Sequence, residues 1–222
     1  MYGAFGVMGA LYHRELTGEG QEVNINLLDA TVGALSEAAV HFLNTGIEPD
    51  RVTPMHACPY IPSPYGIYAT KKGYISISGG HKLAGLCRAL DIDNLEEDPR
   101  FDSALNRDRN RAEFEEIIEQ ALSHKTVDEW LPLMEKEDLW AAPVKNLEGV
   151  FTDPQVLHNN MVVSVDSPIG ELRMPGIPYK LSKTPAQVRT APPTLGQHTE
   201  EVMESLGYSQ SEIDQARTDG AV

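Results

Sequence analysis

The sequence predicts an α/β protein whose first residues belong to a layered domain of helices and sheet. Three observations predict this class: a helix rich in small and apolar residues over 1–16, a strand over 21–26, and a second helix over 27–43. A helix, a tight turn, a strand and a helix in this order are one piece of a layered α/β fold. The printed chain has nothing in front of this piece to form the rest of the sheet, so we expect the first domain to be incomplete.

Each opening element has a local signal. The first helix carries apolar side chains such as Phe5 and Met8 at helical spacing, and Gly18 is placed to end it. Val23 and Ile25 alternate with polar residues, which is the period of a strand. The long apolar run that follows is typical of a helix.

A proline-rich stretch separates these elements from the middle of the chain. Five prolines between residues 49 and 64 exclude a helix and favour extended backbone, so this stretch marks a boundary between a larger and a smaller domain. Beyond it, residues 66–70 and 74–78 alternate around Gly73 as the strands of a β-hairpin do. Residues 81–90 then predict a helix.

The remaining chain alternates between helical and extended patterns. Phe114 and Ile118 lie on one face of the clearest helix, and Thr126 with Glu129 forms a capping box that opens the next one. We expect helices over 109–122, 126–136 and 147–157, a short strand over 141–146, a hairpin of 161–165 with 171–174, an extended return over 175–196, and two terminal helices, the second capped by Ser209.

Composition narrows the class of partner. The 222 residues carry a formal net charge of −15, which argues against nucleic-acid or anionic-membrane surfaces because both require a basic face. The densest basic spots, Lys71-Lys72 and the arginines from Arg107 to Arg111, are interpreted as solvated faces. The two cysteines fit a reducing cytoplasm, and the opening helix is too short to span a bilayer.

Several motifs that could carry chemistry lack the required context. Gly18 and Gly20 lie between a helix and a strand, whereas phosphate-binding glycine loops follow a strand and open a helix. His56 and Cys58, together with His81 and Cys87, match no closed zinc spacing, so we expect no metal. No G-x-S-x-G elbow is present to support a serine hydrolase.

Segments in a fixed order resemble the family III CoA transferases, the group that includes formyl-CoA transferase, carnitine CoA-transferase and α-methylacyl-CoA racemase (the CaiB/BaiF family). The opening TGEGQEVNINLLDA resembles the family's TGxGQxVDVSLLDA. Later family segments resemble PYGIYATKKGYISISGG, LEEDPRF, AAPVKNLEGVFTDPQVLHNNMVVSV and APPTLGQHTEEVMESLGYSQSEI. The resemblance covers almost the whole chain.

The resemblance implies a C-terminal portion of the family fold. That fold is an interlocked dimer in which a Rossmann-like large domain and a small α+β domain are joined by long linkers. On this basis residues 1–48 are a remnant of the large CoA-binding domain, 49–182 the small domain, and 183–222 a linker with helices returning to the large domain. A homodimer, or association with a missing N-terminal half, is the expected assembly.

The resemblance also implies an activity. Family members transfer CoA between an acyl-CoA and a carboxylic acid through an aspartyl intermediate, with the CoA thioester as substrate and no covalently bound cofactor. The family's catalytic Asp precedes the first helix, and we expect it to lie upstream of Met1 and to be absent from this chain. Asp29, at the start of the second helix, is expected to be structural.

Four residues are candidates for substrate contact under the resemblance. Leu27 stands where formyl-CoA transferases carry Met beside the thioester, and His56, Tyr60 and Tyr65 flank the proline-rich loop. The glycine run that some members carry in this loop is missing here. The alternative interpretation of the loop residues is ordinary aromatic packing with a surface histidine.

Two other functions stay open at this point. A racemase on the same fold would exchange the proton α to the thioester carbonyl, and its acid and base would both lie outside this chain. A truncated or split chain would instead be a non-catalytic subunit whose exposed apolar surface requires a partner.

Overall fold

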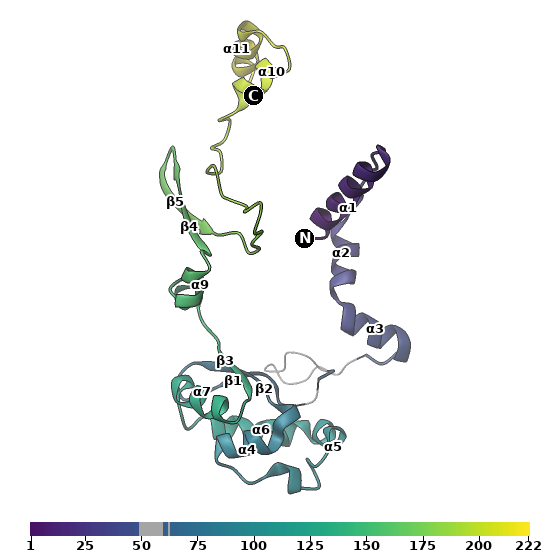
Figure 1. Ribbon diagram of the computed structural model, residues 1–222, viewed down its shortest axis with the longest axis vertical. Coiled ribbons are helices and arrows are strands. Elements are labelled where there is room, and N and C mark those ends of the chain that lie inside the picture. Colours follow the sequence, from purple (N-terminus) through teal and green to yellow (C-terminus); the bar gives the residue numbers. More distant parts are fainter. Residues whose placement is uncertain (49–59, 62) are drawn as a thin grey trace. The chain divides into compact units, whose positions relative to one another are not determined.

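The computed structural model describes residues 1–48, 60, 61 and 63–222, and contains both helices and strands (Figure 1). The chain divides into two units, residues 1–144 and residues 145–222, which are described one after the other.

The chain begins with helix α1 (Tyr2–Thr17), as the sequence predicts. It ends at Gly18, whose φ of 79° is left-handed and whose N–H donates to the Arg14 carbonyl. Only glycine adopts this conformation without steric cost, which explains the stop.

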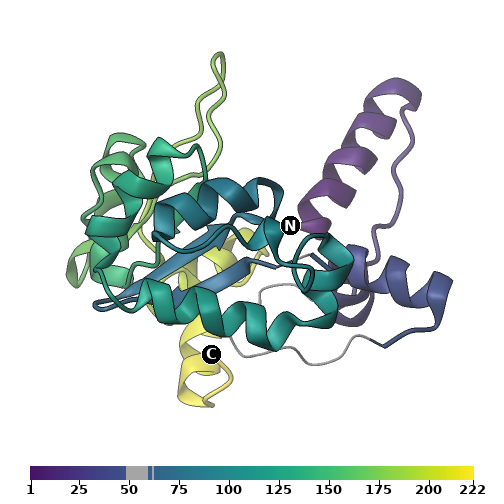
Figure 2. The ribbon, with the colours of Figure 1, turned by 90° about the horizontal axis from the view of Figure 1, so that it is seen from below.

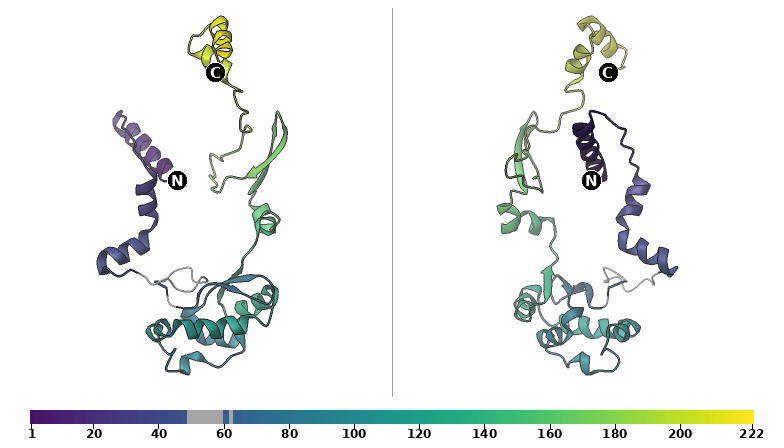
Figure 3. Two further views of the ribbon diagram at one scale, coloured as in Figure 1. Left: turned by 180° about the vertical axis from the view of Figure 1, so that it is seen from behind. Right: turned by 45° about the vertical axis from the view of Figure 1, so that its right-hand side comes forward.

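The strand predicted over residues 21–26 does not form. These residues form neither helix nor strand, and they pair with no strand in the described part of the chain. They run back alongside α1 (Figure 3), where Val23 and Ile25 face Gly6 and Gly3. A strand needs a neighbouring strand to complete its backbone hydrogen bonds. In these residues the period-two pattern instead places Val23 and Ile25 against the small residues of α1.

The long helix predicted over residues 27–43 is two helices, α2 (Leu27–Ala34) and α3 (Ser36–Thr45). At the junction the Leu35 N–H is shared between the Thr31 and Val32 carbonyls, each at 3.2 Å. The Thr31 hydroxyl also donates to the Leu27 carbonyl, a side-chain bond that tends to bend helices. Asn26 caps α2 by accepting the Asp29 N–H at 2.8 Å.

An antiparallel sheet of three strands follows, in the order β1 (Tyr65–Ala69), β2 (Tyr74–Ser78) and β3 (Trp140–Pro143). The predicted hairpin is confirmed, and Gly73 has the positive φ, 90°, that its turn requires. The predicted strand over 141–146 begins one residue earlier and ends at Pro143.

Helices cover one face of this sheet (Figure 2). The helices of this layer that contribute core residues are α4 (Leu83–Leu90), η2 (Leu95–Glu97), α6 (Arg111–Leu122) and α7 (Val127–Lys136), and the same stretch also contains η1 (Gly80–Lys82) and α5 (Ala104–Arg109). The capping box of Thr126 and Glu129 at the start of α7 is confirmed. The core between sheet and helices is closed: Tyr68, Phe114, Ile118 and Met134 are fully buried in it.

The second unit contains four helices and a hairpin among its described residues. These are α8 (Leu147–Phe151), α9 (Pro154–His158), strands β4 (Val162–Ser167) and β5 (Gly170–Pro175), α10 (Thr199–Ser205) and α11 (Gln210–Thr218). The hairpin is confirmed, and so is the capping box of Ser209 with Glu212 on α11. Residues 176–198 form neither helix nor strand, as the prolines predict.

Candidate functional site

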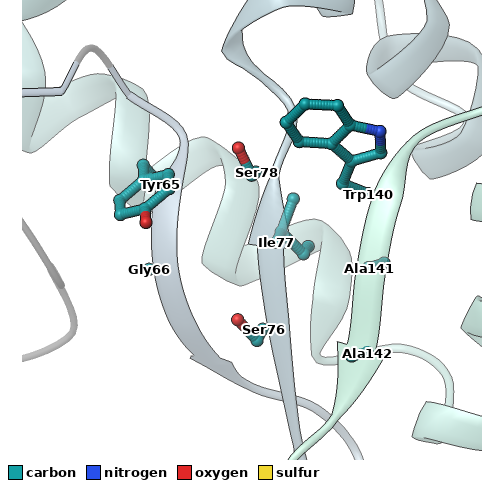
Figure 4. A pocket seen from close by; sticks show the side chains of 8 residues that line it. All are labelled: Tyr65, Gly66, Ser76, Ile77, Ser78, Trp140, Ala141 and Ala142. Atoms are coloured by element: carbon teal, nitrogen blue, oxygen red, sulfur yellow. The ribbon is translucent and has the colours of Figure 1, made fainter. Parts of the chain in front are cut away.

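The face of the sheet opposite these helices carries a pocket of about 340 Å³ (Figure 4). Because side chains alternate along a strand, Tyr68, Ile75 and Ile77 point into the core and their neighbours point outward. The pocket is lined by Tyr65, Gly66, Ser76, Ile77, Ser78, Trp140, Ala141 and Ala142.

Strand register fixes the order of these side chains. Tyr65 pairs with Ser78, and Ser78 with Trp140, so an aromatic ring stands on each side of one hydroxyl. The next row joins Ser76 to Ala142. Figure 4 shows both serine hydroxyls directed toward β1, and the Trp140 indole beside Ser78 with its ring nitrogen on the far side. The pocket therefore has a hydroxyl side and an apolar side.

Trp140 lines the pocket and contacts the ring of His81. Trp140 is 69% exposed, and the His81 ring lies 5.0 Å from it, centroid to centroid. Nearby, Lys82 forms an ion pair with Asp138. The Lys82 ammonium also donates a hydrogen bond to the Asp138 carboxylate, which lowers the pKa of Asp138 from its ordinary value. The carboxylate therefore stays ionised, and its charge is neutralised by the lysine.

A buried polar cluster holds the backbone that leads into β1. The Ser63 hydroxyl donates to the Glu115 carboxylate, and both residues are buried. The Arg111 guanidinium donates to the Ile61 carbonyl at 3.4 Å. One strand farther on, the Gly79 N–H donates to the Pro64 carbonyl at 3.1 Å. The position of Tyr65 is therefore set from behind the sheet, by α6.

The interpretation of Arg107 and Arg111 as solvated is wrong, since each is only 8% exposed. Arg107 donates to the Phe101 carbonyl at 3.1 Å, and burial lowers its pKa. Burial, reinforced by the nearby Glu115 carboxylate, also raises the pKa of Tyr68. These arginines satisfy carbonyls of distant segments, which local charge density does not reveal.

Of the four residues named from the sequence, one lines the pocket. Tyr65 is part of it, whereas Leu27 stands 88% exposed at the start of α2 and is not among its lining residues. Tyr60 packs its ring on His41 of α3, 4.5 Å between centroids. His56 lies outside the described residues.

Sequence reasoning missed Ser76, Ser78 and Trp140. The alternation in residues 74–78 could have placed both serines on the face opposite the core. Trp140 is more than 60 positions away in sequence and joins them only through β3 pairing. Within the described part of the chain, His, Cys, Asp and Glu side chains come together in no group that could hold a metal ion. In the same residues no helix has the length and apolar character needed to cross a bilayer.

Comparison with known proteins gives the family. The model of CoA-transferase family III matches residues 1–199. The human succinyl-CoA:glutarate CoA-transferase is 32% identical over 225 residues, covering 100% of this chain and 50% of that protein. An acyl-CoA transferase of Fusarium pseudograminearum is 31% identical, covering 97% of this chain and 48% of its own length.

A solved structure agrees. The crystal structure of a CaiB/BaiF family protein from Brucella suis superposes with a TM-score of 0.72 at 27% identity, covering 92% of this chain and 53% of that one. The chain thus spans about half the length of the curated relatives it matches. With the profile, the sequences and the fold in agreement, the chain belongs to CoA-transferase family III.

Proposed function

We propose that these residues form the C-terminal part of an enzyme that transfers coenzyme A between an acyl-CoA and a carboxylic acid. The family match over residues 1–199 carries this proposal. The human relative is named for succinyl-CoA and glutarate, so short-chain dicarboxylic acids are the substrate class we assign.

The chemistry proposed is covalent catalysis by an aspartate. Its carboxylate oxygen attacks the thioester carbonyl and expels CoA thiolate, leaving a mixed anhydride on the enzyme. The thiolate attacks the aspartyl carbonyl of that anhydride and releases the first acid, leaving an enzyme–CoA thioester. The acceptor carboxylate attacks the enzyme–CoA thioester and expels CoA thiolate, which forms a second mixed anhydride. The thiolate then attacks the acceptor carbonyl of that anhydride, so the new acyl-CoA leaves and the aspartate is restored. One difficult exchange is thus divided into several easier ones.

We assign the reactive aspartate to a segment outside these 222 residues. No carboxylate is among the residues that line the pocket. The helices α1 to α3 support the assignment, since they bury no residue while Phe5 and Leu28 are 75% and 73% exposed. Apolar faces of this kind require a covering surface, which a large Rossmann-like domain or a second copy in an interlocked dimer would supply.

The test is an assay of the native protein that carries this chain. Succinyl-CoA and isotopically labelled glutarate are supplied, and labelled glutaryl-CoA is followed by mass spectrometry. Borohydride added during turnover would reduce an enzyme–CoA thioester and fix the position of the aspartate. Label appearing in glutaryl-CoA supports transfer. Exchange of the α-proton in deuterium oxide without transfer would establish the racemase alternative. If the protein shows neither CoA transfer nor proton exchange, both proposed functions are refuted.

A further inference from the structure

We infer that the hydroxyls of Ser76 and Ser78 bind a carboxylate of the acid substrate, with the carbon chain lying against Trp140. This inference rests on the proposed function and assigns one end of the substrate to the open face of the sheet. Within the described part of the chain, neither hydroxyl has a hydrogen-bond partner. Both are free to donate into the pocket that Figure 4 shows.

The spacing of the two serines suits one carboxylate. Residues two apart on an antiparallel strand lie about 6.8 Å apart, and both side chains leave the same face. Two O–H···O bonds of about 2.7 Å, slightly inclined to the strand, span that distance together with the two oxygens of a single carboxylate. An apolar ligand alone would leave both hydroxyls without partners, which costs binding energy.

Charge favours a carboxylate over a phosphate. The chain is strongly acidic, with a net charge of −15, yet among the described residues that line this pocket there is no Asp or Glu. Asp138, two positions before Trp140 in the sequence, is paired with Lys82. Phosphates are held by Arg, Lys or backbone N–H groups at helix N-termini, and none of these is among the lining residues. Two neutral hydroxyl donors match the two oxygens of a single carboxylate better than the higher charge and three oxygens of a phosphate.

Size and apolar surface favour a short carbon chain. A volume of about 340 Å³ is at the small end of ligand pockets. Trp140 and Ala142 offer apolar surface beside the serines, long enough for a few methylene groups. A dicarboxylic acid of about four to six carbons fits this arrangement.

The test is a binding titration that requires no catalysis. Glutarate is added to the 15N-labelled 222-residue chain at constant ionic strength, and the two tryptophan indole N–H resonances are followed by NMR. The Trp140 resonance is expected to move with saturation. The Trp130 resonance is the internal control, because its indole is buried and donates to the Leu122 carbonyl. Glutaramide, which lacks the charges, is expected to cause no saturable shift.

Variants then identify the donors. Replacing both Ser76 and Ser78 by Ala is expected to weaken glutarate binding about tenfold or more, whereas replacing both by Thr, which retains the hydroxyls, restores binding. Tyr74→Phe is the matched control, since Tyr74 is on β2 but outside the pocket. Unchanged affinity in the alanine variant, or a Trp140 resonance that glutarate does not move, overturns the inference.

The two proposals fail separately. CoA transfer by the native protein together with a silent Trp140 resonance would refute the carboxylate subsite and leave the function standing. Saturable glutarate binding in a protein that transfers no CoA would refute the function and retain the subsite. In an active enzyme, the alanine variant is expected to raise KM for the acceptor acid while leaving KM for the acyl-CoA unchanged.

Discussion

Trp130 is the side chain whose replacement tests the core most sharply. It is 1% exposed, and its indole N–H donates to the Leu122 carbonyl at 2.9 Å. Leu122 ends α6, where carbonyl groups lack partners within the helix. Trp130→Phe removes this bond, leaves the buried carbonyl unsatisfied and opens a small cavity. Together these effects cost about 3 kcal/mol, or about a hundredfold in the folding equilibrium.

The measurement is urea unfolding followed by far-ultraviolet circular dichroism. With a urea dependence of about 1–3 kcal/mol per molar, the midpoint should fall by about 1–3 M. The chain offers a matched control in Trp140→Phe, because that tryptophan is 69% exposed and its replacement should change stability by about 0.5 kcal/mol or less. Equal midpoints for the two variants would contradict the burial and the hydrogen bond assigned to Trp130.

Three further predictions concern other parts of the chain. A Cβ at Gly6 would lie 2.8 Å from a valine methyl group, whereas a Cβ at Gly9 would meet nothing within 4 Å. Gly6→Ala should therefore destabilise α1, and Gly9→Ala should stabilise it by about 0.5–1 kcal/mol. Thermal midpoints in the reverse order would contradict this. Hydrogen bonds from Lys145 and two backbone N–H groups lower the pKa of Asp153. Its contribution to stability is therefore present above the ordinary aspartate pKa and is lost as the pH falls through the lowered value. Lys145→Met should raise the pKa of Asp153 in an NMR titration, and an unchanged pKa would refute the ion pair. Burial raises the pKa of the Cys87 thiol. In a variant whose other cysteine is replaced by serine, this thiol should react with Ellman's reagent only in denaturant. Fast reaction of the native variant would show that the thiol is accessible.

Elements with strong local signals could be predicted from the sequence. Gly18 ends α1 through a left-handed conformation that few other residues tolerate, and Gly73 sets the turn of the hairpin in the same way. The capping boxes at Thr126 and Ser209 form as their spacing indicates. In each case the deciding interaction joins residues at most a few positions apart.

Features that depend on distant residues were missed. The alternation around Val23 predicted a strand, but the alternating residues contact α1 and, among the residues the structure describes, have no neighbouring strand. Arg111 is buried because the Ile61 carbonyl, 50 positions away, accepts its hydrogen bond. Trp140 likewise reaches the serines of β2 only through sheet pairing. The family pattern led to Tyr65, and alternation along residues 74–78 is enough to place both serines, whereas placing Trp140 beside them required the register of the sheet.

The one-sided covering of the sheet has a consequence for how this protein can change. Along β2, Ile75 and Ile77 are committed to the core, while Ser76 and Ser78 between them face outward. Residues that maintain the fold and residues that would select a ligand thus interleave without competing for the same space. A small library of substitutions at the outward positions should therefore change the preference for the acceptor acid with little change in the free energy of unfolding.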